Sequence, residues 1–228
     1  MDKKQSRGLF NFWLPLMGLL YGLYHVLVRP RFLRWGALAA EINRPMNGDP
    51  LIPRPNLEAT RAIDINATPE TVWAWLMQMG RERTGFYGID RIDNWGIPSA
   101  TYLRRDLPAL TVGTTLDNGL KVFDINSHDL HLLMGVFDRP HELGGNIDLT
   151  YLYSLERTAN GSTRLIVRMR GYTDGTGAWF YNRFFEVMDY VMGQTQLKGI
   201  KARAEAYQPP IPMPIPFDQY DRPIQSWN

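Results

Sequence analysis

Two histidines three residues apart, His128 and His131, are the first side chains in this sequence whose spacing could serve metal chemistry. On a helix this spacing would bring both imidazoles to one face, where they could bind a metal ion. Residues 126–134 alternate more as a strand does, however, and strand residues three apart point to opposite faces of a sheet. The chain also has no cysteine, which excludes thiolate ligands and thiolate nucleophiles. We therefore expect neither a metal site nor a cofactor.

Four carboxylates, those of Asp90, Asp93, Glu142 and Asp148, could act as general acids or bases. Their spacing matches no known catalytic motif, and the sequence has no nucleophile elbow and no phosphate-binding glycine loop. Carboxylates of this kind are usually solvated loop residues or helix caps. An enzyme would need one of them buried in a cavity with a perturbed pKa. The sequence leaves catalysis open and favours a protein without it.

Aromatic and methionine side chains favour the binding of an apolar molecule. Aromatic residues make up 12% of the chain, which also has ten methionines; both types suit deformable cavities, although an aromatic-rich core would give the same composition. Arg168 could donate to a ligand head group if its strand face is wet and internal, whereas it points to solvent if the apolar face packs on a helix. The residues that we expect to line a ligand cavity, each of which could instead be ordinary core, are Tyr87, Trp95, Tyr102, Phe123, Tyr151, Tyr153, Arg168, Met188 and Met192.

A strand, a helix, several further strands and a final helix must position these candidates. Alternating side chains predict a strand over residues 61–66, and Thr68 and Pro69 then supply the start of a helix that Gly80 ends. A proline-free stretch with helical apolar spacing predicts a long helix over residues 178–207. Turn signals predict two hairpins, one with strands over residues 112–116 and 120–125 and one with strands over 148–157 and 163–171.

An apolar segment precedes this domain. The 21 residues from Gly8 to Val28 carry no charge, and at ~1.5 Å per residue such a helix would span the ~30 Å hydrocarbon core of a bilayer. A cleaved signal peptide and an interfacial or buried helix are the alternatives. Gly18 and Gly22 form a G-x-x-x-G pattern that could admit a second membrane helix. Basic residues flank both ends of the segment, so the side of the membrane is not predicted. The expected anchor residues include Leu14, Gly18, Gly22 and Leu23.

The chain divides into four parts by composition. We expect a membrane anchor over residues 1–36, an extended linker over 37–56, a folded domain over 57–207 and a Pro-rich extended tail over 208–228. There are 25 Lys and Arg against 23 Asp and Glu, which gives a net charge of +2, and no basic cluster is interleaved with aromatic residues. Nucleic acid is therefore not an expected partner.

Several segments of the domain resemble one known superfamily. The residues that carry the resemblance are Thr60–Ile65 running into Ala67–Gly80, then Gly85-Phe86-Tyr87 and Thr163–Arg170, with Trp35-Gly36-Ala37 ahead of the linker. They resemble uncharacterised bacterial proteins of the START/Bet v 1-like superfamily (SRPBCC, polyketide cyclase-like), over residues 56–207. The resemblance implies an α+β helix-grip fold, in which a curved antiparallel sheet wraps a long C-terminal helix. It also implies a cavity between sheet and helix for a lipid, quinone, polyketide or pigment.

The function that we expect is a membrane-tethered module that binds a hydrophobic small molecule. Its partners would be that molecule and membrane lipid, and it would be located at a membrane. An alternative is a non-catalytic accessory or structural subunit of a larger membrane protein complex, held among other subunits by the anchor and the Pro-rich tail. A third hypothesis is a cyclase- or dehydratase-type enzyme, because the superfamily also contains enzymes. A shared fold cannot choose among them.

Overall fold

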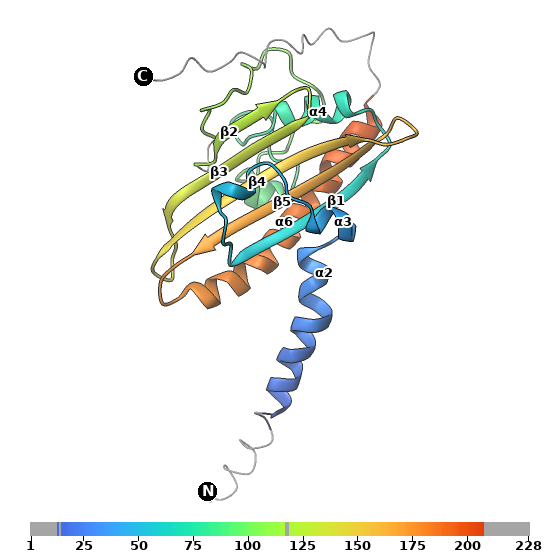
Figure 1. Cartoon of the computed structure of the whole chain (residues 1–228). Helices are drawn as coiled ribbons and strands as arrows, with labels where there is room; N and C mark the ends of the chain where they lie inside the picture. Colours follow the sequence, from blue (N-terminus) through green and yellow to red (C-terminus); the bar gives the residue numbers. More distant parts are fainter. Residues whose placement is uncertain (1–12, 14, 117–118, 208–228) are drawn as a thin grey trace, which may run out of the picture.

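The computed structural model describes residues 13, 15–116 and 119–207, and its architecture is α+β (Figure 1). Five antiparallel strands form one sheet in the order β1-β5-β4-β3-β2, and a long C-terminal helix crosses one face of this sheet. The expected α+β class, antiparallel sheet and C-terminal helix are confirmed. The elements are η1 (Tyr24–Val28), α2 (Arg29–Leu33), α3 (Ala39–Asn43), η2 (Asp49–Leu51), β1 (Leu57–Ile65), α4 (Pro69–Met77), α5 (Asp90–Asp93), β2 (Lys121–Asn126), β3 (His131–Pro140), β4 (Asn146–Arg157), β5 (Thr163–Thr173) and α6 (Ala178–Ala206).

The strands pair as consecutive hairpins from β2 to β5. β4 and β5 pair over residues 147–157 and 163–173, as the turn signal between them predicted. The earlier turn signal was right in part. The segment before the turn joins the start of β2 through an antiparallel bridge between Thr115 and Lys121 and through backbone hydrogen bonds, which include Val122 N–H to the Thr114 carbonyl at 2.8 Å. The described residues of that segment do not form a regular strand, however, and β2 pairs with β3 on its other side.

Helix α4 begins where its capping residues predict. Thr68 accepts a hydrogen bond from the backbone N–H of Thr71 at 3.4 Å, and Pro69 occupies the first turn. Most of α4 is buried because it closes one end of the sheet and contacts both β4 and α6. The core formed there holds the second half of α6 against the sheet, and its members include Ile65, Trp75, Leu76, Leu132, Leu165, Leu197 and Ile200. We call the sheet face that α6 covers the inner face.

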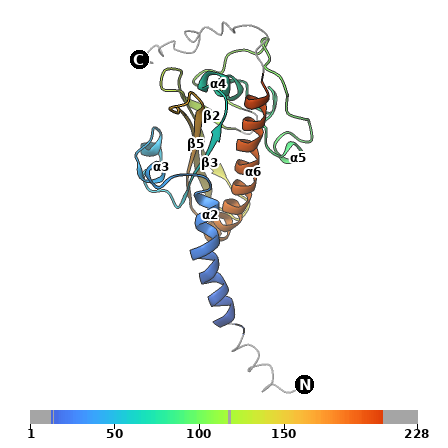
Figure 2. The same ribbon diagram turned by 90° about the vertical axis from the view of Figure 1, so that its right-hand side faces the viewer.

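The opposite, outer face of the sheet is covered by the segment that composition predicted to be an extended linker. Residues 37–56 contain the short helices α3 and η2 and lie against β1 and β5 (Figure 2). The guanidinium of Arg164 on β5 pairs with the buried carboxylate of Glu41, with the two atoms 2.8 Å apart. Where the segment begins, a Cβ on Gly36 would lie only 2.1 Å from the carbonyl oxygen of Ala62, so that position requires glycine. The segment is thus part of the folded domain.

The N-terminal helix leaves the domain at its base (Figures 1 and 2). Residues 15–23 are α-helical and continue through η1 into α2, which is tied to α6 by the ion pair of Arg29 with Glu186 at 2.7 Å and by stacking of Phe32 on Tyr190. Within the described part of the chain, no helix combines the length and apolar character needed to cross a bilayer, so the expected transmembrane helix lacks support. Leu14 and the tail over 208–228 lie outside the described residues.

Candidate functional site

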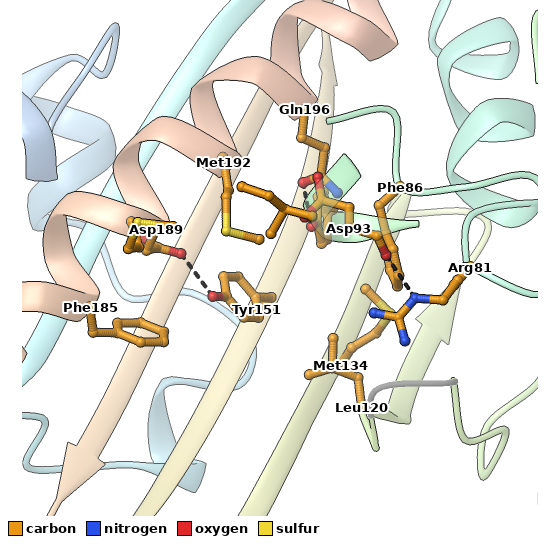
Figure 3. A pocket seen from close by; sticks show the side chains of 14 residues that line it. Arg81, Phe86, Asp93, Leu120, Met134, Tyr151, Phe185, Asp189, Met192 and Gln196 are labelled. Atoms are coloured by element: carbon orange, nitrogen blue, oxygen red, sulfur yellow. Dashed lines mark hydrogen bonds between the residues drawn. The ribbon is translucent and has the colours of Figure 1, made fainter. Parts of the chain in front are cut away.

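A cavity of about 220 Å³ lies between the inner face of the sheet and the middle of α6. Its walls are mainly apolar, and α6 contributes a side chain to it at nearly every inward-facing turn (Figure 3). Engineered apolar cavities of ~150 Å³ hold benzene, so this volume admits a compact organic molecule. The lining residues are Arg81, Phe86, Ile92, Asp93, Leu120, Met134, Tyr151, Tyr153, Phe185, Met188, Asp189, Met192, Gly193 and Gln196.

A buried charge pair lies behind the middle of the cavity. Arg61, on the inner face of β1, and Asp189, on α6, are both buried, and their charged groups are 2.6 Å apart. Tyr151 on β4 donates its hydroxyl to the other oxygen of Asp189 at 2.8 Å (Figure 3). Arg61 also donates to the carbonyl of Phe32 at 2.9 Å, whereas its second terminal nitrogen has no hydrogen-bond partner among the described residues. The carboxylate of Asp189 thus faces the cavity, while Arg61, on the side away from the cavity, balances its charge.

A second polar group lies about two helical turns further along α6. Tyr153 donates its hydroxyl to the side-chain oxygen of Gln196 at 2.8 Å, and the amide nitrogen of Gln196 reaches only the sulfur of Met79. A thioether is a weak acceptor, so this amide donor can be redirected towards a ligand. Burial, followed by the negative charge of Asp189, raises the pKa of both Tyr151 and Tyr153 above the ordinary tyrosine value. Both phenols are therefore neutral at physiological pH.

Asp93 and Arg81 lie at the other end of the cavity. Asp93 accepts a hydrogen bond from the N–H of Ile89 at 2.7 Å, and Arg81 donates to the backbone carbonyl of Asp93 at 2.8 Å. Burial raises the pKa of the Asp93 carboxyl above its ordinary value. Close packing explains the burial, because a Cβ on Gly88 would lie 2.2 Å from the carboxyl oxygen. Of the four carboxylates considered from the sequence, Asp93 therefore meets the requirement of a buried cavity acid with a perturbed pKa.

The cavity contains four of the predicted lining residues, and the other five lie elsewhere. Tyr151, Tyr153, Met188 and Met192 line it. Tyr87 is a core residue whose hydroxyl donates to the carbonyl of Trp75 at 3.1 Å. Trp95 is 77% exposed and Tyr102 is 63% exposed; the former packs under the guanidinium of Arg81 at 4.2 Å. Phe123 packs edge-on against Phe137 and beside Gly135, on the outer face. Among the predicted residues, the structure therefore brings together those on β4 and α6.

Arg168 does not reach the cavity either. It points from β5 to the outer face, where it is buried under the segment over residues 37–56. Its guanidinium donates to the carbonyls of Glu41, Ile42 and Arg44 at 2.7 to 2.9 Å, to the carboxylate of Asp49 and to the hydroxyl of Thr60. The alternative in which the apolar face of the strand packs on the C-terminal helix and leaves Arg168 on the outer side is confirmed. The solvent exposure expected with it is wrong, because the segment over residues 37–56 buries Arg168.

The two histidines are also separated in the structure. His128 lies in the turn between β2 and β3, and His131 begins β3, where it contacts Asp124 at 2.8 Å. The strand expected across both residues is therefore interrupted by a turn. Among the described residues, no group of three or more potential ligands gathers into a metal site.

The buried polar residues of α6 were not predicted, although the sequence contains a signal for them. Asn182, Glu186, Asp189 and Gln196 recur at helical spacing on the side that faces the sheet, and the first three are buried. A polar stripe at this spacing normally marks the solvent side of a helix. Here it faces inward, so Asp189 and Gln196 enter the site together with Arg61 from β1.

Comparisons with known proteins add little to this geometry. No family model matches the chain, and no curated protein matches it. Among solved structures, a hypothetical protein from Helicobacter pylori is similar at 11% identity, over 71% of this chain and 98% of that one, with a TM-score of 0.48. A conserved protein from Geobacillus kaustophilus is similar at 17% identity, over 65% and 95%, with a TM-score of 0.40. A protein from Nitrosomonas europaea is similar at 13% identity, over 71% and 98%, with a TM-score of 0.41. No assignment of function follows from likenesses this distant.

Proposed function

We propose that this protein binds a small amphipathic molecule in the cavity between its sheet and α6. The observation that carries the proposal is the cavity itself, which combines apolar walls from Phe86, Met134 and Met192 with a few convergent polar groups. That combination is typical of small-molecule sites. The antiparallel sheet crossed by a long C-terminal helix is also the arrangement expected of a helix-grip domain of the START/Bet v 1-like superfamily, so the sequence resemblance supports the same proposal.

The polar groups favour a ligand with a neutral hydroxyl. Asp189 and the phenolic oxygens of Tyr151 and Tyr153 can all accept a further hydrogen bond, whereas the strongest donor of the cavity, Arg81, lies at its other end. A ligand carboxylate placed beside Asp189 would meet a like charge in a region of low dielectric. An alcohol head group avoids this repulsion and satisfies the carboxylate. We therefore propose an alcohol or a phenol attached to an apolar body as the ligand class.

The proposal is tested by isolating the full chain in an amphipathic polymer and identifying small molecules that co-purify with it by mass spectrometry. Binding of a lipophilic fluorescent probe is then measured in the delipidated protein. Met192→Trp fills the cavity and should weaken probe binding at least tenfold, whereas the adjacent, exposed Val191→Trp should leave it unchanged. Circular dichroism checks that both variants fold. Absence of any co-purified molecule, together with equal probe binding by both variants, would overturn the proposal.

Tethering to a membrane is supported by the surface on the other side of α6. Along the first half of α6, apolar side chains face outward and polar side chains face the sheet. The polar stripe is buried, and the side chains exposed at helical spacing are Phe180, Phe184, Val187 and Val191. The neighbouring N-terminal helix exposes apolar side chains on several of its sides. Met17, Leu19 and Leu20 are all exposed, and successive residues of a helix point in directions ~100° apart. A single protein partner covers one side of a helix, whereas lipid covers all of them.

Flotation of the full chain with vesicles of zwitterionic and anionic lipid tests this part of the proposal. Leu19→Glu/Leu20→Glu should prevent the protein from floating with the vesicles, because two charges would enter the apolar layer. Leu51→Glu/Leu143→Glu, which adds two charges at other exposed leucines, is the matched control and should float as the wild type does. If the double variant floats equally well, the tether is wrong. Extraction in one large particle with other proteins would favour the accessory-subunit hypothesis instead.

Asp93 favours an enzyme as the second candidate function. A carboxyl group with a raised pKa at the cavity wall can serve as a proton donor or acceptor. The test is to incubate the co-purified molecule with the wild-type protein and with Asp93→Asn and to compare its mass and isomer composition over time. Conversion by the wild type alone would support catalysis, and an unchanged molecule in both samples would leave binding as the function.

A further inference from the structure

A second cavity lies at the same interface between the sheet and α6. Its volume is about 170 Å³, and it is formed by the far ends of β3 and β4 with the first turns of α6. Val136, Ile147 and Leu149 supply apolar wall, while Arg139 and Glu142 supply charge. Neither cavity alone reaches the ~300–1,000 Å³ that is typical of ligand sites, but their volumes combined do.

Of the described residues, Phe185 is the one whose side chain lines both cavities. It projects from α6 towards the sheet, beside Asp189 and Tyr151 (Figure 3). On its other side its ring stacks on Tyr181 at 5.8 Å between centroids, and Tyr181 in turn stacks on His141 at 4.3 Å. Phe185 is only half-buried, so fewer contacts hold its ring in one rotamer than hold a fully buried side chain. Phe185 is thus the side chain that the linings of the two cavities share, and it packs in one cluster with Leu149 and Tyr151.

We propose that Phe185 is a movable partition, and that the two cavities join into one trough for a long single-chain alcohol. This inference rests on the proposed function and specifies the shape of its ligand. The hydroxyl binds at Asp189 and Tyr151, and the chain passes Phe185 into the second cavity along Val136, Ile147 and Leu149. From Tyr181 to Gln196 the axis of α6 rises ~22 Å at ~1.5 Å per residue, so the joined trough suits an extended molecule better than a compact one.

Displacement of a lipophilic fluorescent probe by 1-alkanols of increasing length tests the inference on the full chain in an amphipathic polymer. In the wild type, affinity should rise by about fourfold for each added methylene and continue to rise beyond the length that fills the first cavity. Phe185→Trp should stop the rise several carbons earlier, and Phe185→Ala should extend it. Phe184→Ala, at the neighbouring exposed position, is the control and should follow the wild type. Partitioning of alkanols into the polymer is common to all four proteins and cancels in the comparison.

The outcomes separate this inference from the proposed function. If short alkanols bind but the rise ends at the same length in the wild type, Phe185→Trp and Phe185→Ala, the partition does not move and the inference is wrong, while the binding function stands. If no alkanol of any length displaces the probe from the wild type, the binding function itself fails for this ligand class. A loss of folding in Phe185→Ala would be seen by circular dichroism, and Phe185→Trp then still decides the question.

Discussion

The two faces of the sheet each bury an arginine, and the two arginines are bound differently. On the outer face, Arg168 donates to three backbone carbonyls, a hydroxyl and a carboxylate. On the inner face, Arg61 donates to one carbonyl and one carboxylate, and one of its nitrogens lacks a partner among the described residues. A cavity lies beside the second arginine, whereas the first is covered by the segment over residues 37–56.

This difference separates a structural charge from a functional one. A guanidinium whose donors are all satisfied by the chain holds that chain in place and offers nothing to a ligand. A guanidinium that balances a carboxylate at a cavity wall keeps the carboxylate charged in an apolar site, where it can receive a hydrogen bond. The outer face is therefore expected to govern stability, and the inner face is expected to govern binding.

The largest effect on stability should come from Arg168→Met. The substitution leaves the carbonyls of Glu41, Ile42 and Arg44 without their side-chain donor and removes one of the partners of the Asp49 carboxylate, which should lower the free energy of unfolding by about 3–5 kcal/mol. Urea unfolding followed by tryptophan fluorescence measures the loss. Arg157→Met removes an exposed ion pair with Glu70 and should cost at most about 1 kcal/mol. Arg168→Met that weakens 1-alkanol binding without destabilising the fold would break the distinction between the faces.

Asp189→Asn should affect both stability and binding. It leaves the buried charge of Arg61 without a counter-ion but retains an oxygen acceptor, so we expect a loss of about 2–3 kcal/mol in the free energy of unfolding. It should also weaken 1-alkanol binding at least tenfold, because the carboxylate that accepts the hydroxyl is gone. Probe displacement measures the affinity.

The double variant Arg61→Met/Asp189→Leu sharpens the same comparison. Removing both charges of a buried pair often restores stability, because no unpaired charge remains. We expect unfolding close to that of the wild type but alkanol binding as weak as in Asp189→Asn. Binding that recovers along with stability would show that Asp189 acts only through the fold.

Much of the fold was predictable because it depends on local signals. Thr68 and Pro69 specify the start of α4, and the pattern after residue 178 specifies α6. The outer face was not predictable from such signals. Prolines and glycines in residues 37–56 indicate irregular backbone, but they do not say that Glu41 will pair with Arg164 more than a hundred residues away. Composition alone cannot distinguish a free linker from a segment that packs on residues distant in the sequence.

The site was half predictable for a related reason. Tyr151, Tyr153, Met188 and Met192 combine apolar bodies with polar or polarizable ends, and this property identified them. Asp189 was missed because a charged residue on a helix usually faces solvent, and here the apolar residues take the solvent side instead. A polar helix face that points into the protein can be predicted only when the partner of its buried charge, here Arg61 on β1, is known.

Tyr151→Phe should have the smallest effect, and its signature is a dependence on pH. Burial and the charge of Asp189 raise the pKa of Tyr151 in the folded protein, while in the unfolded chain it titrates near its ordinary value of ~10. The folded state therefore holds its proton where the unfolded state releases it, so this contribution is complete below pH ~10 and is lost as the pH rises further, by up to ~1.4 kcal/mol per pH unit.

Tyr151→Phe should cost about 1 kcal/mol at neutral pH through the lost hydrogen bond, and it should make the decline in stability above pH ~10 less steep. Urea unfolding between pH 8 and pH 11, the range around the ~10 titration point, measures both effects. Val122→Ala, a core substitution that destabilises without removing a tyrosine, should keep the wild-type steepness. If stability declines equally steeply in the wild type and in Tyr151→Phe, the phenol ionises as freely in the folded protein as in the unfolded chain. The inner face at Tyr151 would then be accessible to solvent, and the proposed difference between the two faces of the sheet would be wrong.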